Sequence, residues 1–387
     1  MKKHNDVLIF TSIYFPGFKG GGPIRTIVNM VEALGCEINF SLVTLDRDLG
    51  DINPYPNVKS DAWQQVGKAQ VYYASPAHAF TKILKIIRNL QGDALHLNSF
   101  FSFRFSILPL LIARWAKPQL PIVVGPRGEF SEGALILKSA KKRLYITMAK
   151  LLGFYKNVIW HASTVHEAED IRRVMGKDAV IRTAIDIATP EANLTLTPRR
   201  EGTPLRVIFI SRISPMKNLF GAIEILKKVQ CPVDFHVYGP AEDQAYWAEC
   251  QSAAAALPRH VSFSYKGTLQ AQQVAQKFAE YDLFLFPTLG ENFGHVIAEA
   301  LSAGLPVLLS NNTPWRDLEA KELGWDLALG QTEGFVRCIE ACHDKSAVEY
   351  NQWREQIRVW ALQNIGDQEA IEQNRQLFMN LRPSYGH

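Results

Sequence analysis

Two glutamates in the stretch GENFGHVIAEALSAG are spaced to bind a ligand that carries hydroxyl groups. Glu291 comes first, Asn292, Phe293 and Gly294 follow it, and Glu299 comes eight residues after Glu291. A helix that opens at Phe293 or Gly294 would leave its first N–H groups free to bind an anion. The Glu299 carboxylate, one to two turns inside, could accept two neighbouring hydroxyls, as on a ribose. The alternative is a capping glutamate followed by an ordinary helical glutamate.

Two cations follow an apolar run in the same half of the chain. Arg212 and Lys217 lie five residues apart in SRISPMKN, just after the predicted strand Arg206–Ile210. Arginine can hold a phosphate with two N–H groups, and lysine adds a compact charge. The pattern therefore indicates a phosphate site, with a solvated basic loop as the alternative.

A run of glycines follows the first predicted strand, in FPGFKGGGP. Gly20, Gly21 and Gly22 precede Pro23, which is favoured in the first turn of a helix. Glycines allow a backbone to approach a ligand closely, and helix starts attract anions. Since the run is neither G-x-G-x-x-G nor a P-loop, a flexible turn remains the alternative.

These candidates need a framework, and apolar runs that alternate with amphipathic ones predict it. Helical segments such as Thr26–Leu34 and Phe103–Trp115 separate several of the runs. This βαβ order predicts α/β domains with parallel sheets, whose ligands bind beyond the carboxyl ends of the strands. The predicted strands are Val7–Phe10, Ile38–Thr44, Gln70–Tyr73, Ala94–Leu97, Ile122–Val124, Trp160–Ala162, Arg206–Ile210, Asp234–Val237, Val261–Tyr265, Leu283–Phe286, Pro306–Leu309 and Asp326–Leu329.

The alternation breaks once, at a polar segment rich in proline and threonine. We therefore predict two doubly wound, Rossmann-like domains, residues 1–187 and 204–366, joined by a linker at 188–203. The segment 367–387 has a helical pattern without a strand after it, and we expect it to pack on the first domain.

Composition excludes several classes of protein. The net charge of +4 is too small to indicate nucleic-acid binding. Five scattered cysteines do not form a disulfide framework, and no apolar run reaches the ~18 residues of a membrane span. We expect a cytoplasmic protein, able to lie peripherally on the inner face of a membrane.

Two further segments have a possible chemical meaning. Asp46-Arg47-Asp48 has the D-x-D pattern of a metal site, but Asp51 nearby favours a solvated acidic loop, and we expect no metal and no cofactor. Residues 135–157 combine apolar side chains with six lysines or arginines and no acidic residue. That segment could contact an anionic membrane, or it could be a surface helix packed on its own domain.

Taken in order, these motifs resemble those of a known family. The glycine loop, SRISPMKN, VYGP, SFSYKGTL and the E-x7-E pair resemble the retaining glycosyltransferases of family 4, over nearly the whole chain. The resemblance implies the GT-B fold, with two Rossmann-like domains facing a central cleft. It also implies sugar transfer, with retention, from a nucleotide-diphospho-sugar donor to a glycan or lipid-linked acceptor, as in bacterial surface polysaccharide biosynthesis.

The resemblance also implies roles for individual residues. Glu299 would hold the ribose, and Glu291 the hydroxyls of the donor sugar. Arg212 and Lys217 would neutralise the diphosphate in place of a metal ion. The remaining donor contacts would come from Gly21, Gly22, Gly267, Thr268, Leu269, Asn292, Phe293 and Gly294.

The first domain departs from the family where many members have a histidine after the strand equivalent to Ile122–Val124. The loop here reads GPRGEF, so Arg127 and Glu129 are the available polar groups. His161, at the end of a later strand, is the other candidate for the acceptor side, or else a hydrogen-bonded structural histidine. Two alternative functions are a sugar-nucleotide epimerase of the same fold and a non-catalytic nucleotide-sugar-binding protein.

Overall fold

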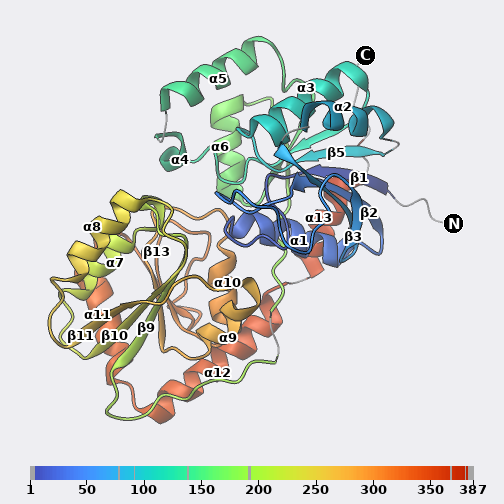
Figure 1. The fold of residues 1–387 in the computed structure, drawn as a ribbon. Helices are drawn as coiled ribbons and strands as arrows, with labels where there is room; N and C mark the ends of the chain where they lie inside the picture. The colour runs from blue at the N-terminus through green and yellow to red at the C-terminus, as the bar shows by residue number, and fades with distance from the viewer. Residues whose placement is uncertain are drawn as a thin grey trace. The chain divides into compact units, whose positions relative to one another are not determined.

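The chain forms two α/β units, each with its own sheet of mostly or entirely parallel strands (Figure 1). The computed structural model describes residues 5–76, 79–90, 92–136, 139–190, 193–366, 368–379 and 381. The first domain consists of Met1–Ile187 and Asp367–His387, and the second of Ala188–Gly366. Two passages of the chain therefore connect the domains.

The first domain is built on a sheet in the order β3-β4-β2-β1-β5-β6-β7-β8. All neighbouring strands are parallel except β3, which runs antiparallel to β4. Its strands are β1 (Asn5–Phe10), β2 (Ile38–Leu45), β3 (Trp63–Val66), β4 (Ala69–Ala74), β5 (Ala94–Leu97), β6 (Ile122–Val124), β7 (Ile159–Ala162) and β8 (Val180–Thr183). Its helices are α1 (Gly22–Leu34), α2 (Ala79–Asn89), α3 (Leu108–Ala116), α4 (Glu132–Ile136), α5 (Ser139–Leu151), α6 (Val165–Met175) and α13 (Gln368–Phe378), with a π-helical turn at Phe103–Ile107.

Strand β1 shows why helices cover both faces of this sheet. Successive side chains of a strand point to opposite faces, and here both sets are buried. Val7 and Ile9 pack with α1 and α13, whereas Leu8 and Phe10 join a cluster that includes α2 and α3. Strand β1 has β2, the next strand in the chain, on one side and β5 on its other side. The strand order therefore reverses at β1, and ligands are predicted to bind beyond the carboxyl ends of β1 and β5.

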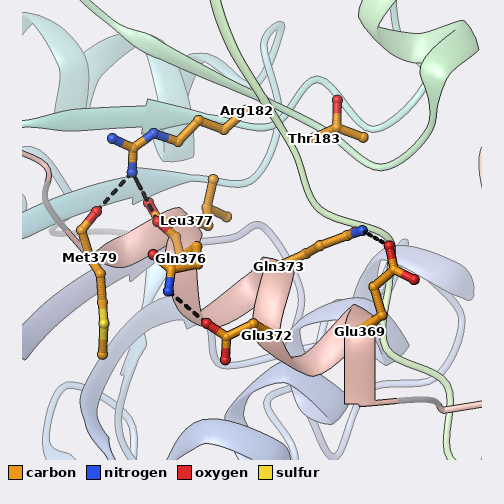
Figure 2. Close-up of a pocket in the computed structure, with 8 residues that line it drawn as sticks. All are labelled: Arg182, Thr183, Glu369, Glu372, Gln373, Gln376, Leu377 and Met379. Atoms are coloured by element: carbon orange, nitrogen blue, oxygen red, sulfur yellow. Dashed lines mark hydrogen bonds between the residues drawn. The ribbon is translucent and has the colours of Figure 1, made fainter.

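Helix α13 packs beside α1 in the first domain (Figure 1). Arg182 of β8 donates from Nη1 to the carbonyl oxygens of Gln376 and Met379, at 2.9 Å each, at the carboxyl end of the helix (Figure 2). The arginine complements the negative end of the helix dipole. Asn374 donates to the Ile185 carbonyl at 2.7 Å. Polar contacts therefore hold α13 both at its carboxyl end and within the helix.

The second domain has an entirely parallel sheet in the order β11-β10-β9-β12-β13-β14. Its strands are β9 (Leu205–Ile210), β10 (Val233–Tyr238), β11 (Val261–Tyr265), β12 (Leu283–Phe286), β13 (Val307–Ser310) and β14 (Gly324–Leu327). Its helices are α7 (Leu219–Leu226), α8 (Gln244–Ala254), α9 (Val274–Phe278), α10 (His295–Ser302), α11 (Thr332–Asp344) and α12 (Ala347–Asn364), with short 3₁₀ turns at Pro215–Lys217 and Ala271–Gln273. The order of the strands reverses between β9 and β12, which is where such sheets bind ligands.

A buried polar cluster lies near the amino ends of strands β9 and β12. The Asp282 carboxylate, fully buried, accepts hydrogen bonds from Nη2 of Arg206 at 2.7 Å and Nη1 of Arg199 at 3.2 Å. The Tyr350 hydroxyl donates to the backbone carbonyl of Asp282. Arg354, also buried, donates to the carbonyl oxygens of Gly304, Thr197 and Ala279. The charged groups of this cluster are thus paired or hydrogen-bonded, as burial requires.

Three expectations about the elements need correction. Residues 188–203 are part of the second domain rather than a linker, because Leu194 and Arg199 are buried in it. The expected helix Phe103–Trp115 begins as a π-helical turn, and α3 begins only at Leu108. The strand expected at Asp326–Leu329 is β14, which begins two residues earlier. Strands β3 and β8 were not predicted.

Candidate active site

The loops after β9 and β12 meet at the carboxyl edge of the second sheet because the two strands are neighbours there. The backbone carbonyl of Met216, in the first loop, accepts from the Leu289 N–H at 2.8 Å and the Thr288 hydroxyl at 3.0 Å. Asn218 donates to the Pro287 carbonyl at 2.8 Å. Several hydrogen bonds therefore hold the two loops in a fixed arrangement.

Lys217 and Glu291 are brought together by this arrangement. Their side chains form an ion pair, and both are largely buried, with 14% and 12% of their surface exposed. The lysine ends a 3₁₀ turn, and Asn218 follows in the left-handed region at a φ of 58°. Asn218 also caps α7 by accepting from the Gly221 N–H at 3.2 Å. The hydrogen bonds of Asn218 thus hold the backbone directly after Lys217.

Arg212 lies in the same loop, two residues after the end of β9. Its Nη1 is 3.3 Å from the Glu242 carboxylate, in the loop after β10, and both side chains are partly exposed. An exposed pair of this kind contributes about 1 kcal/mol or less. The guanidinium can therefore exchange this partner for a phosphate at little cost.

Helix α10 begins at His295, one or two residues after the predicted start at Phe293 or Gly294. Gly294 is its N-cap at a φ of +83°, a conformation that favours glycine. The Trp315 indole donates to the Phe293 carbonyl at 2.7 Å, and the Glu291 N–H donates to the Asn312 carbonyl at 3.1 Å. Hydrogen bonds to the segment that follows β13 thus hold the loop between the two glutamates in place.

Of the two glutamates, Glu291 lies in the loop and Glu299, half-buried, lies within α10. Asn292 is half-buried in the loop between them. Because α10 begins after Gly294, the two carboxylates belong to different elements. They can thus contact different parts of a long ligand.

The loop after β11 carries Gly267, Thr268 and Leu269, at the other end of the same sheet edge. Gly267 has a φ of +80°, and a Cβ added to it would meet no atom within 4 Å. Its carbonyl accepts from the Gly239 N–H at 2.9 Å. Strands β10 and β9 separate this loop from β12, so it can contact only a ligand that extends along the edge.

The glycine loop of the first domain precedes α1, with Gly21 as the N-cap at a φ of 65° and Gly22 as the first helical residue. The Asp48 carboxylate anchors this loop by accepting from the N–H groups of Phe18 at 2.8 Å and Lys19 at 3.2 Å. The D-x-D is therefore not a solvated loop. Asp46 and Asp48 are 1% and 4% exposed, and Asp48 serves the backbone.

The candidate histidine of the first domain is structural. His161 is fully buried, its Nε2 donates to the Ala184 carbonyl at 2.9 Å, and its Nδ1 accepts from Arg127 at 3.1 Å. Burial, reinforced by the charge of Arg127, lowers the pKa of His161 to about 3. The histidine is therefore neutral and has no exposed nitrogen for a substrate.

Arg127 and Glu129 also have internal partners. The Arg127 guanidinium donates to Asn98 at 2.6 Å, Ser163 at 2.8 Å and Asp186 at 3.0 Å. The Glu129 carboxylate accepts from the Ser99 hydroxyl and from the N–H groups of Phe100 and Phe101, at 2.6–3.1 Å. Burial raises the pKa of Glu129. Both side chains thus hold the loops at this edge.

Comparison with known proteins matches the second domain to a family. Residues 197–358, nearly all of that domain, match the model of glycosyl transferases group 1. The second domain belongs to this family.

Two curated glycosyltransferases share part of the sequence. Sulfoquinovosyl transferase SQD2 of Arabidopsis thaliana is 30% identical over 118 residues, which are 30% of this chain and 21% of the relative. O-antigen chain mannosyltransferase B of Escherichia coli is 25% identical over 154 residues, 38% of each chain. The matches thus span about a fifth and about two-fifths of these relatives.

Solved glycosyltransferase structures resemble both domains. HepE of Anabaena, in complex with UDP-glucose, matches with a TM-score of 0.71 over 97% of this chain and 98% of its own, at 14% identity. The chain therefore has the GT-B fold. Among the residues that the structure describes, none of the helices has the length and hydropathy of a membrane-spanning helix.

Sequence reasoning missed the residues that hold the site in shape. The sequence weakly indicates the role of Asn218, because asparagine tolerates the left-handed region and often caps helices. Trp315 lies in the polar loop SNNTPW after a strand, but nothing there reveals that its indole reaches Phe293. Asp48 was noticed only as half of a metal motif.

Proposed function

We propose that this glycosyltransferase moves a sugar from a nucleoside-diphosphate sugar to an acceptor hydroxyl, with retention at the anomeric carbon. The observation that carries the proposal is the Lys217–Glu291 pair, held where the strand order reverses and directly before the start of α10. A cation and the N–H groups at the start of a helix suit a diphosphate, and a carboxylate suits the hydroxyls of a sugar.

In the proposed reaction the bond between the anomeric carbon and the β-phosphate oxygen breaks. The acceptor oxygen bonds to the same face of the carbon, and its proton passes to the departing phosphate. Lys217, Arg212 and the first N–H groups of α10 stabilise the negative charge that develops on the diphosphate, which is electrostatic catalysis. No protein base is required, in keeping with the internal partners of His161 and Glu129.

UDP-glucose is the first donor to test, because the HepE structure contains it. A glycan or lipid-linked acceptor of surface polysaccharide biosynthesis is supported by the likeness to O-antigen chain mannosyltransferase B. Product analysis separates the proposal from its alternatives. Transfer gives a glycosylated acceptor and free nucleotide, an epimerase gives an altered sugar nucleotide, and a binding protein gives neither.

Glu299→Gln should weaken the binding of free UDP, whereas Glu291→Gln should leave it nearly unchanged and impair use of the sugar donor. The loss of one charge-assisted hydrogen bond to the ribose, ~1.5–3 kcal/mol, corresponds to a roughly 10- to 100-fold increase in Kd. Calorimetry with UDP alone and kinetics with the full donor measure the two effects separately.

Glu224→Gln is the matched control, because Glu224 is a helical glutamate that pairs with Lys227 away from this edge. It should change neither quantity. Equal losses of UDP affinity in both site variants, or no loss in either, would show that the carboxylates do not divide the ribose and the sugar between them.

Transfer should also continue in the presence of a chelator. Lys217 and Arg212 supply the positive charge that a divalent metal ion would otherwise provide at the diphosphate. Initial rates are compared after dialysis against EDTA and after addition of Mn²⁺ or Mg²⁺. Activity that disappears with EDTA and returns with metal would contradict the cationic mechanism.

A further inference from the structure

Helix α5 has two apolar faces, and only one of them is packed against its own domain. Ala149 is fully buried, and the Tyr145 hydroxyl is 2.7 Å from that of Tyr155. On another face, Leu144, Met148 and Leu151 are 71%, 44% and 82% exposed. Their spacing of four and then three residues places them in one stripe along the helix. Leu152, directly after the helix, is 60% exposed and extends the stripe.

Basic residues accompany this stripe. Lys141 and Arg143 are exposed on the same helix, and Lys156 is exposed just beyond it. No acidic residue occurs between Glu132 and Glu167, a stretch of the chain that holds six lysines or arginines. The surface is therefore apolar along its centre and positive along its sides.

Two other cations of α5 make hydrogen bonds to their own domain. Lys142 donates to the Ala134 carbonyl at 2.6 Å, and Lys150 donates to the Val174 carbonyl at 3.0 Å. These contacts hold α5 on the first domain. The exposed leucines thus belong to a helix whose orientation is already fixed, rather than to one that could turn its apolar face inward.

We propose that α5 lies in the headgroup region of an anionic lipid bilayer. Leu144, Met148, Leu151 and Leu152 would enter the acyl boundary, while Lys141, Arg143 and Lys156 would contact lipid phosphates. An exposed apolar stripe with basic flanks is the pattern of an interfacial helix. The charge argues against a second copy of the chain as the occupant, because two such surfaces would bring like charges together.

Sedimentation with vesicles tests the proposal without any measurement of enzyme activity. The protein should bind vesicles of phosphatidylcholine with phosphatidylglycerol, should bind pure phosphatidylcholine far more weakly, and should dissociate as salt is raised. Leu144→Ser with Leu151→Ser should lower the partition coefficient about tenfold or more, since both side chains would leave the acyl boundary. Lys141→Gln with Arg143→Gln should lower it about 25-fold, roughly fivefold for each charge.

Val348→Ser is the control, because Val348 is also exposed, at 67%, but lies on α12 in the second domain. It should bind vesicles like the unaltered protein. Thermal melting of every variant should be unchanged, since the replaced side chains are exposed. Equal binding to neutral and anionic vesicles, or undiminished binding by both double variants, would overturn the proposal. So would light scattering that shows a dimer lost in Leu144→Ser with Leu151→Ser, because the stripe would then join two copies.

Discussion

Lys217→Ala should lower the turnover number about 100-fold or more, the loss typical of one preorganised group that stabilises charge in a transition state. The lysine lies at the switch point of the second sheet, and its position is fixed by the turn before Asn218. We propose that its charge stabilises the departing diphosphate, so kcat should fall more than the affinity for the donor. Steady-state kinetics over a range of UDP-glucose concentrations separates these two quantities.

Removing Lys217 also leaves the largely buried Glu291 without its cation. The Lys217→Ala variant should therefore be compared with the double variant that also carries Glu291→Gln. If the lysine acts on the diphosphate, the double variant should turn over more slowly than Glu291→Gln alone. Lys228→Ala is a matched control, because Lys228 forms an exposed ion pair with Glu333 in the same domain. A double variant with the same turnover number as Glu291→Gln alone would show that Lys217 only neutralises Glu291.

Asp282→Asn should lower the free energy of unfolding by about 3–5 kcal/mol, the range found when one partner of a buried ion pair is removed. The fully buried carboxylate is the shared anion of Arg199 and Arg206. The amide of asparagine is similar in shape but carries no charge, so the buried Arg199 guanidinium would lose its counter-ion. Urea unfolding monitored by tryptophan fluorescence measures the change.

Glu280→Gln is the control for this experiment. Glu280 is two residues away and pairs with Lys277, but it is 41% exposed. Its loss should cost about 1 kcal/mol or less. If Asp282→Asn unfolds at the same urea concentration as Glu280→Gln, the buried cluster contributes no more to stability than a surface pair.

The central strands could be predicted from the sequence because both of their faces are buried. Strands β5, β6 and β12, whose side chains are all buried, begin and end at the predicted residues. Strand β11 also has its predicted bounds, although it is an end strand of the second sheet and only partly buried. The two that were missed, β3 and β8, are the end strands of the first sheet. Their side chains are largely exposed or half-buried, so they lack the apolar run that marks a strand.

The candidate site could be predicted where topology alone brings residues together. Lys217 and Glu291 follow strands that are neighbours at a switch point, so their proximity follows from the order of the strands. The role of Arg127 could not be predicted, because its partners Asn98, Ser163 and Asp186 come from separate loops and each could have been an exposed polar residue. Nothing in the local sequence shows which of these groups pair with one another.

The double passage of the chain between its domains has a consequence for synthesis. The second domain is continuous in the sequence and is complete once residue 366 has left the ribosome. The first domain begins earlier but must wait for α13, whose Leu377 and Phe378 fill part of its core. Domains usually complete folding in order from the amino terminus. Here the first domain made is the last to be completed, and until then its sheet lacks the side chains that cover part of one face.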